Sequence, residues 1–84
     1  MKPYETIQTA VQAAFEEVFG LPAAGEDADT PYSPDDEAKA LQLEEAVQAA
    51  VGLPSTPKIF RFVSGVNVQP ASVTSVAEQL FSEQ

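Results

Sequence analysis

Hydrophobic residues recur with helical spacing in three stretches of the chain. In the first, residues 6–19, successive apolar positions lie four, four, three and one residues apart. They are Ile7, Val11, Phe15, Val18 and Phe19. This spacing places all of them on one face of a helix that ends at Gly20, with Pro3 suited to its entry turn. We therefore expect an amphipathic helix whose phenylalanines belong to the core.

A second helix is predicted over residues 33–53, where start and stop signals flank an apolar stripe. Ser33 can cap the free backbone N–H groups, and Pro34 fits the first helical position. Asp35 and Asp36 then face the positive end of the helix dipole, and Gly52 follows the last apolar turn. The expected stripe consists of Ala38, Leu41, Leu43, Val47, Ala50 and Val51.

The third helical pattern lies near the C-terminal end of the sequence. Ser72 is a good N-cap, and apolar residues follow at i, i+3, i+4, i+7 and i+8. They are Val73, Val76, Ala77, Leu80 and Phe81. These positions predict an amphipathic helix.

The segments between the helices are less regular. Residues 21–32 contain two prolines, a glycine and three acids, which predicts a long loop. We expect Leu21 and Tyr32 to anchor this loop on the core, although Tyr32 also suits a surface contact. Residues 58–69 allow two structures. Thr56-Pro57, just before them, favours a short helix that comprises KIFRFVS and is followed by an extended segment. The alternative is a hairpin, because IFRFV and VNV are rich in strand formers and the intervening Ser64-Gly65 suits a two-residue turn.

Composition limits the possible partners. Thirteen acidic and four basic residues give the 84-residue chain a formal net charge of −9. Nucleic acid is excluded as a partner because binding to phosphates requires lysine or arginine. The charge instead favours a basic protein surface. No apolar run is long enough for a membrane span and no signal sequence is evident, so we expect a cytoplasmic monomer with no membrane contact.

The chemistry available to the side chains is narrow. The sequence has no histidine and no cysteine, so the usual general bases, thiol nucleophiles and zinc ligands are missing. A calcium loop starting at Asp27 would place Pro31 at a ligand position and Tyr32 where the turn needs glycine. We therefore expect neither an enzyme nor a metal site.

The central stretch resembles helix II of the acyl and peptidyl carrier proteins, which carry phosphopantetheine on the serine of an Asp-Ser-Leu motif. Leu43, Val47 and the terminal Gly52-Leu53 fall where that family has its leucines and its closing Gly-Leu. Ala38 and Leu41 match the apolar positions one and four residues after the serine.

The serine position itself is Glu37, so the motif reads Asp36-Glu37-Ala38. The final ASVTSVAEQL is similar to the last helix of carriers, and the resemblance extends from Ile7 to Phe81. VSGVNVQ departs from it as an apparent insertion.

The resemblance implies one all-α domain over residues 1–84, a small carrier-protein-like bundle. It would have three main helices, a short third element and a long loop after the first helix. Because Glu37 has no hydroxyl to receive a phosphate, no cofactor is expected. The carboxylate can imitate the charge of a loaded carrier and can stabilise the helix start, and the two roles are compatible.

The implied function is docking or scaffolding on the basic surface of a polyketide, nonribosomal-peptide or fatty-acid biosynthetic enzyme. By position, the partner-binding candidates are Asp36, Glu37, Ala38, Leu41, Gln42 and Glu45. Two alternatives stay open. The chain is a working carrier with phosphopantetheine on Ser33, or an unrelated acidic helical adaptor.

Overall fold

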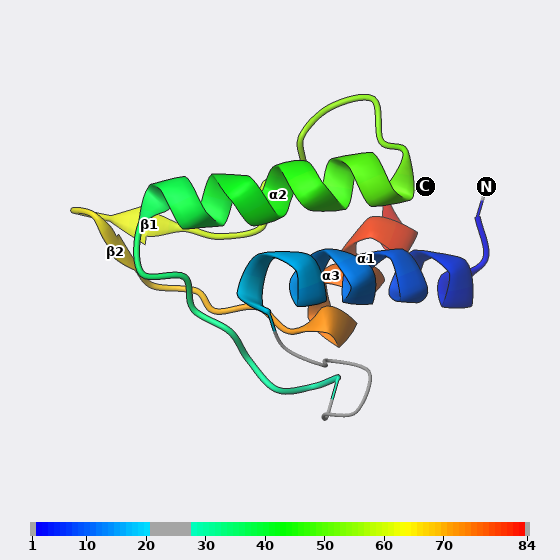
Figure 1. Ribbon diagram of the computed structural model, residues 1–84, viewed down its shortest axis with the longest axis horizontal. Helices are drawn as coiled ribbons and strands as arrows, with labels where there is room; N and C mark the ends of the chain where they lie inside the picture. The colour runs from blue at the N-terminus through cyan, green and yellow to red at the C-terminus, as the bar shows by residue number, and fades with distance from the viewer. Residues whose placement is uncertain (1, 21–27, 84) are drawn as a thin grey trace.

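The computed structural model describes residues 2–20 and 28–83, most of which lie in three helices (Figure 1). In chain order its elements are α1 (Tyr4–Phe19), α2 (Glu37–Val51), β1 (Phe62–Val63), β2 (Val66–Asn67) and α3 (Val73–Ser82). Helix α1 packs against both α2 and α3, and the predicted all-α class with three main helices is confirmed. None of the helices in the described ranges is both long enough and apolar enough to cross a bilayer.

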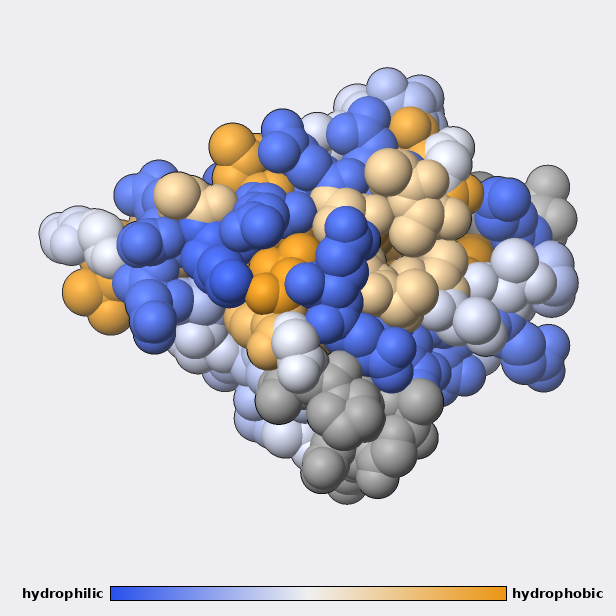
Figure 2. Space-filling model, viewed as in Figure 1, coloured by the Kyte–Doolittle hydropathy of each residue, from blue (hydrophilic) through white to orange (hydrophobic). Residues whose placement is uncertain are grey.

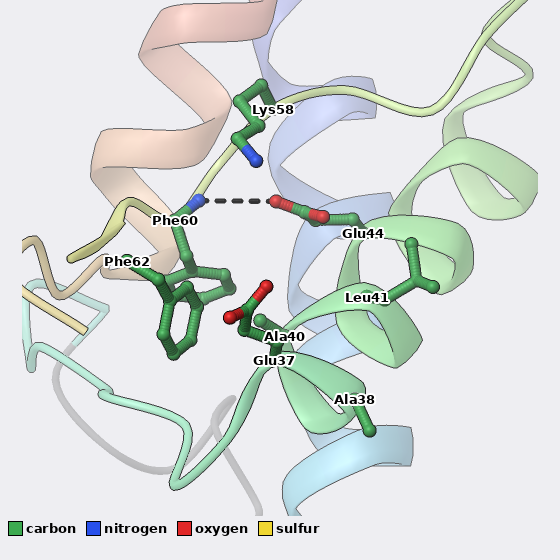
Figure 3. A pocket seen from close by; sticks show the side chains of 8 residues that line it. All are labelled: Glu37, Ala38, Ala40, Leu41, Glu44, Lys58, Phe60 and Phe62. Atoms are coloured by element: carbon green, nitrogen blue, oxygen red, sulfur yellow. Dashed lines mark hydrogen bonds between the residues drawn. The ribbon is translucent and has the colours of Figure 1, made fainter. Parts of the chain in front are cut away.

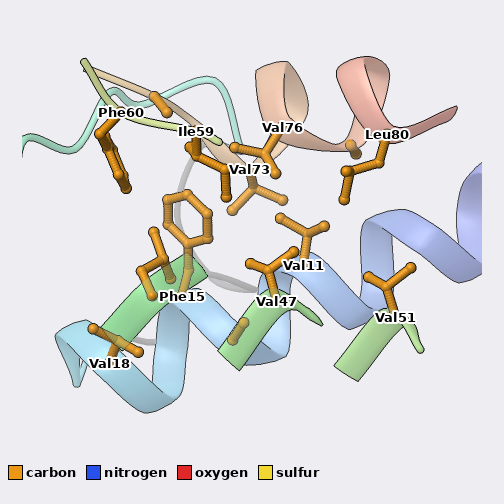
Figure 4. Packing of buried hydrophobic residues seen from close by; sticks show 14 of the residues in the cluster. Val11, Phe15, Val18, Val47, Val51, Ile59, Phe60, Val73, Val76 and Leu80 are labelled. Atoms are coloured by element: carbon orange, nitrogen blue, oxygen red, sulfur yellow. The ribbon is translucent and has the colours of Figure 1, made fainter. Parts of the chain in front are cut away.

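The hydrophobic core draws side chains from all three helices and from the segment that precedes the hairpin (Figure 4). Its largest fully buried members are Phe15, Phe60, Ile7, Leu43, Val11, Val47, Val73 and Val76. Phe15 was expected in the core and is 1% exposed, whereas Phe60 enters the core from outside the three helical patterns. Segment 58–62 is thus held to the bundle by its own apolar side chains.

The start of α2 differs from the prediction. The helix begins at Glu37 rather than near Ser33, and its N-cap is Asp36, whose Oδ1 accepts a hydrogen bond from the Lys39 N–H at 2.8 Å. The preceding chain is kept extended because Tyr32 pairs with Ala71 in an antiparallel bridge, with N···O distances of 2.8 and 3.0 Å. This long-range pairing prevents a helical turn at residues 33–36 and leaves the cap to Asp36.

The buried face of α2 is also rotated from the predicted stripe. Ala38, Leu41 and Ala50 are exposed, while Leu43, Val47 and Val51 are buried as expected. The complete buried set is Ala40, Leu43, Glu44, Val47 and Val51, which follows i, i+3, i+4, i+7 and i+11. The prediction was wrong at Ala38 and Leu41 in the first turns and at Ala50 in the last turn, and it did not allow Glu44 on the core face.

A hairpin formed by β1 and β2 lies within residues 58–69, so the short helix favoured by Thr56-Pro57 is wrong and the alternative is confirmed. Strands β1 and β2 pair with Val63 opposite Val66, across the two-residue turn Ser64-Gly65. Both turn residues have positive φ angles, 54° and 80°, which is the combination a type I′ hairpin turn requires. The short third element is therefore a small sheet.

The two ends of α1 and the anchoring of the loop after it can be compared with the predictions. Gly20 ends the helix in the left-handed conformation as expected, and Pro3 is the N-cap before a first helical residue at Tyr4. The Tyr32 ring stacks on Phe19 at a centroid distance of 5.1 Å, which confirms Tyr32 as an anchor of the first loop. Leu21, the other expected anchor, lies outside the described residues.

Helix α3 starts as predicted, with Ser72 as N-cap in a capping box with Ser75. Phe81 is less buried than its place in the stripe suggested. It is 43% exposed and meets the Tyr4 ring edge-on at 5.8 Å. Burial raises the pKa of the Tyr4 hydroxyl, and the negative charges of Glu78 and Asp29 add to this effect.

Candidate functional site

The six residues predicted to contact a partner lie in the N-terminal half of α2 or directly before it, and all six are exposed. Glu37, Leu41 and Glu45 are spaced four residues apart, so they form one row along the helix. Ala38 and Gln42 form a parallel row beside it. Five of the six predicted residues thus share one exposed face of the helix, hereafter the α2 face, and Asp36 precedes them as the N-cap.

The α2 face combines carboxylates with an exposed leucine. Leu41 is 48% exposed and lies between Glu37 and Glu45 in its row. Figure 2 shows hydrophilic residues over most of the surface seen in that view, with hydrophobic residues in separate small patches. An exposed leucine flanked by two carboxylates suits an amphipathic contact, in which apolar burial gives affinity and charge gives orientation.

Two acids at the start of α2 differ in what they can offer a partner. The Asp36 carboxylate is engaged in capping, as its hydrogen bond to Lys39 shows. Glu37 is the first residue of the helix, exposed and next to the unsatisfied N–H groups at the positive end of the dipole. Its carboxylate is therefore favourably placed for the helix and accessible to another molecule.

A cavity of about 300 Å³ adjoins the α2 face (Figure 3). Its lining comes from α2 and from the segment that leads into β1. The residues are Glu37, Ala38, Ala40, Leu41, Glu44, Lys58, Phe60 and Phe62. Three members of the predicted set thus share a depression with residues 58–62, which the sequence had not connected to them.

Glu44 joins these two walls of the cavity. It is only 7% exposed, and its Oε2 atom accepts hydrogen bonds from the backbone N–H groups of Ile59 and Phe60, at 2.9 and 3.2 Å. One carboxylate on α2 thereby satisfies two successive backbone donors of the opposite segment. Glu44 was not singled out from the sequence, although it lies four residues after Ala40 and three before Val47, at helical spacing from two apolar positions.

Ser33, the alternative attachment residue, is not at a helix start. It is exposed, lies four residues before α2, and its Oγ accepts a hydrogen bond from the Asn67 side-chain amide at 3.0 Å. Its hydroxyl therefore helps to hold the chain before α2 against β2. The free N–H groups at the start of α2, which could bind a phosphate, are closer in sequence to Glu37 than to Ser33.

The hairpin presents a second, less polar surface. Val63, Val66 and Val68 are between 50% and 62% exposed. Val63 and Val66 are cross-strand partners, so their side chains lie on the same face of the hairpin.

No protein-family model matches the chain, and no curated protein or solved structure matches it either.

Proposed function

We propose that the chain is a carrier-like docking domain that binds the basic surface of a biosynthetic enzyme and carries no phosphopantetheine. The observation that supports this most directly is the α2 face, where Leu41 is 48% exposed between the exposed residues Glu37 and Glu45. Binding is then a matter of surface complementarity, and no group of the chain takes part in a reaction.

The position of Glu37 connects the α2 face to the resemblance with carriers. It occupies the place of the attachment serine and is the first residue of α2. A phosphodiester at that place would put negative charge beside the positive helix end. The Glu37 carboxylate supplies negative charge in the same region without a covalent bond, so a partner that recognises a loaded carrier by charge would accept it.

Charge reversal tests the docking proposal. The double variant E37K/E45K is titrated against purified polyketide-synthase, nonribosomal-peptide and fatty-acid enzymes encoded near the gene. We expect about a tenfold loss of affinity at low salt, since two favourable charge contacts become repulsive. The control E17K/E83K makes the same change in net charge at two exposed glutamates outside the α2 face, and it should bind like the wild type.

Two results would contradict the proposal. One is equal affinity of the two double variants for every partner found, because recognition would then not involve the α2 face. The other is a gain in mass when the wild type is incubated with coenzyme A and a phosphopantetheinyl transferase. If peptide mapping then placed the added group on Ser33, the chain would be a working carrier.

A further inference from the structure

The cavity beside the α2 face is lined by five apolar residues and by three ionisable ones, Glu37, Glu44 and Lys58. Phe60, which is 1% exposed, and the buried Ala40 line it together with the half-buried Phe62. Leu41 lines the cavity from its α2 side, so the exposed leucine of the α2 face is at the border of the cavity. Figure 3 shows it on α2, with Phe60 and Phe62 on the opposite segment. About 300 Å³ is at the small end of the range for ligand sites and suits a side chain better than a large molecule.

The charges around the cavity are unequal on its two sides. Glu37 and Glu44 are on the α2 side, where Glu44 already accepts two backbone hydrogen bonds, and Lys58 is on the opposite segment. The sequence contains no acidic residue between Glu45 and Glu78, and both Lys58 and Arg61 fall in that interval. A basic group of a partner near the cavity is therefore attracted to the carboxylates of α2 and repelled by Lys58 and Arg61.

From this combination we propose that the partner inserts one apolar side chain, of leucine or phenylalanine size, into the cavity. The inserted residue is flanked on one side by arginine or lysine, which pairs with the carboxylates of the α2 face. This inference rests on the proposed docking function and specifies the partner as a basic segment with a single apolar anchor. The basic residue follows from charge complementarity with Glu37, and the apolar anchor follows from the apolar residues of the lining.

A short peptide series tests the anchor directly. The probes are acetyl-Arg-Arg-X-Gly-Gly-amide peptides with X as glycine, alanine, leucine or phenylalanine, titrated into the ¹⁵N-labelled full chain. All four carry the same charge, so their differences report on the side chain X. We expect the leucine or phenylalanine peptide to bind about tenfold more tightly than the glycine peptide, as burial of a large apolar side chain predicts. Their shifts should include the amides of Ala40, Phe60 and Phe62.

A pair of variants separates the cavity from the rest of the surface. F62A removes an aromatic wall of the cavity without changing the α2 face, and V63A truncates the next residue, which is 50% exposed and does not line the cavity. F62A should abolish the preference for leucine over glycine, while V63A should keep it. Circular dichroism of both variants checks the fold, and the peptide series on the wild type stands without either variant.

The outcomes distinguish this inference from the function on which it rests. If all four peptides bind equally and charge reversal at Glu37 and Glu45 still weakens the enzyme partner, the cavity takes no anchor and the docking proposal stands. If charge reversal has no effect on the partner, the docking proposal fails. Shifts confined to residues away from the cavity would also overturn the anchor.

Discussion

Replacing Glu44 by alanine should lower the free energy of unfolding by about 2–6 kcal/mol. The substitution removes the acceptor of two backbone N–H groups, those of Ile59 and Phe60, from a position where the carboxylate is 7% exposed. Each buried donor left without a partner costs about 1–3 kcal/mol. Because Glu44 lines an open cavity, water can reach the site in part, and this favours the lower half of the range.

The glutamine variant refines the argument. E44Q keeps a carbonyl oxygen as acceptor but loses the charge, and hydrogen bonds to charged groups contribute about 1.5–3 kcal/mol against about 0.5–1.5 kcal/mol for neutral ones. We therefore expect E44Q to lose about half as much stability as E44A. The neighbouring Glu45 is exposed, so E45A is the matched control and should stay within about 0.5 kcal/mol of the wild type.

Urea unfolding followed by circular dichroism measures these differences, and hydrogen exchange locates them. The loss should be largest for E44A, and the amides of Ile59 and Phe60 should exchange faster in that variant. An 84-residue domain has about 4–12 kcal/mol of stability in total, so a loss of this size is easily resolved. If E44A unfolds at the same urea concentration as E45A, the buried carboxylate does not hold the segment, and the reasoning is refuted.

Three further predictions concern α2 and the tyrosines. L43A should lower the free energy of unfolding by about 2–5 kcal/mol in urea, because Leu43 is 0% exposed. L41A should change the stability by less than about 0.5 kcal/mol and weaken partner binding. Equal losses of stability in the two variants would contradict the burial of Leu43 and the exposure of Leu41. E37S should gain mass with coenzyme A and a phosphopantetheinyl transferase if the start of α2 is carrier-like, and an unmodified E37S would remove that support. In Y32F the phenolate absorbance of Tyr4 should titrate at higher pH in the folded chain than in urea, because its pKa is raised. The associated stability is complete below the ordinary tyrosine pKa of about 10 and is lost as pH rises through the folded value, so the reverse order of midpoints would refute this prediction.

Periodicity was sufficient to identify the three helices because each of them buries one continuous face. The apolar residues of α1 and α3 recur at helical intervals, and both helices have clear end signals in Gly20 and Ser72. For these elements local sequence and tertiary packing favour the same structure.

The errors arose where a distant residue decides the local conformation. Ser33 had the properties of an N-cap, but the pairing of Tyr32 with Ala71 keeps the chain extended at that point. The helix favoured by Thr56-Pro57 is replaced by strands because Phe60 packs in the core and its N–H binds Glu44. These long-range contacts leave no periodic trace in a single sequence.

The candidate site was predicted on one side only. The candidates on the α2 face were predicted from the resemblance to carriers, and they are exposed. The cavity beside them was not predicted, because its second wall comes from residues 58–62, whose conformation had been assigned incorrectly. Phe62 and Lys58 could be placed opposite Glu37 only after the hairpin was known.

Four carboxylates of α2 and its cap show how position determines role for one kind of group. Asp36 caps the helix and Glu44 holds the opposite segment, so both are committed to the fold. Glu37 and Glu45 are exposed on the same helix face. A charge change at Asp36 or Glu44 would alter stability together with binding, and the two effects could not be separated. Changes at Glu37 and Glu45 leave the cap and the buried hydrogen bonds in place, so a loss of binding there reports on the surface itself.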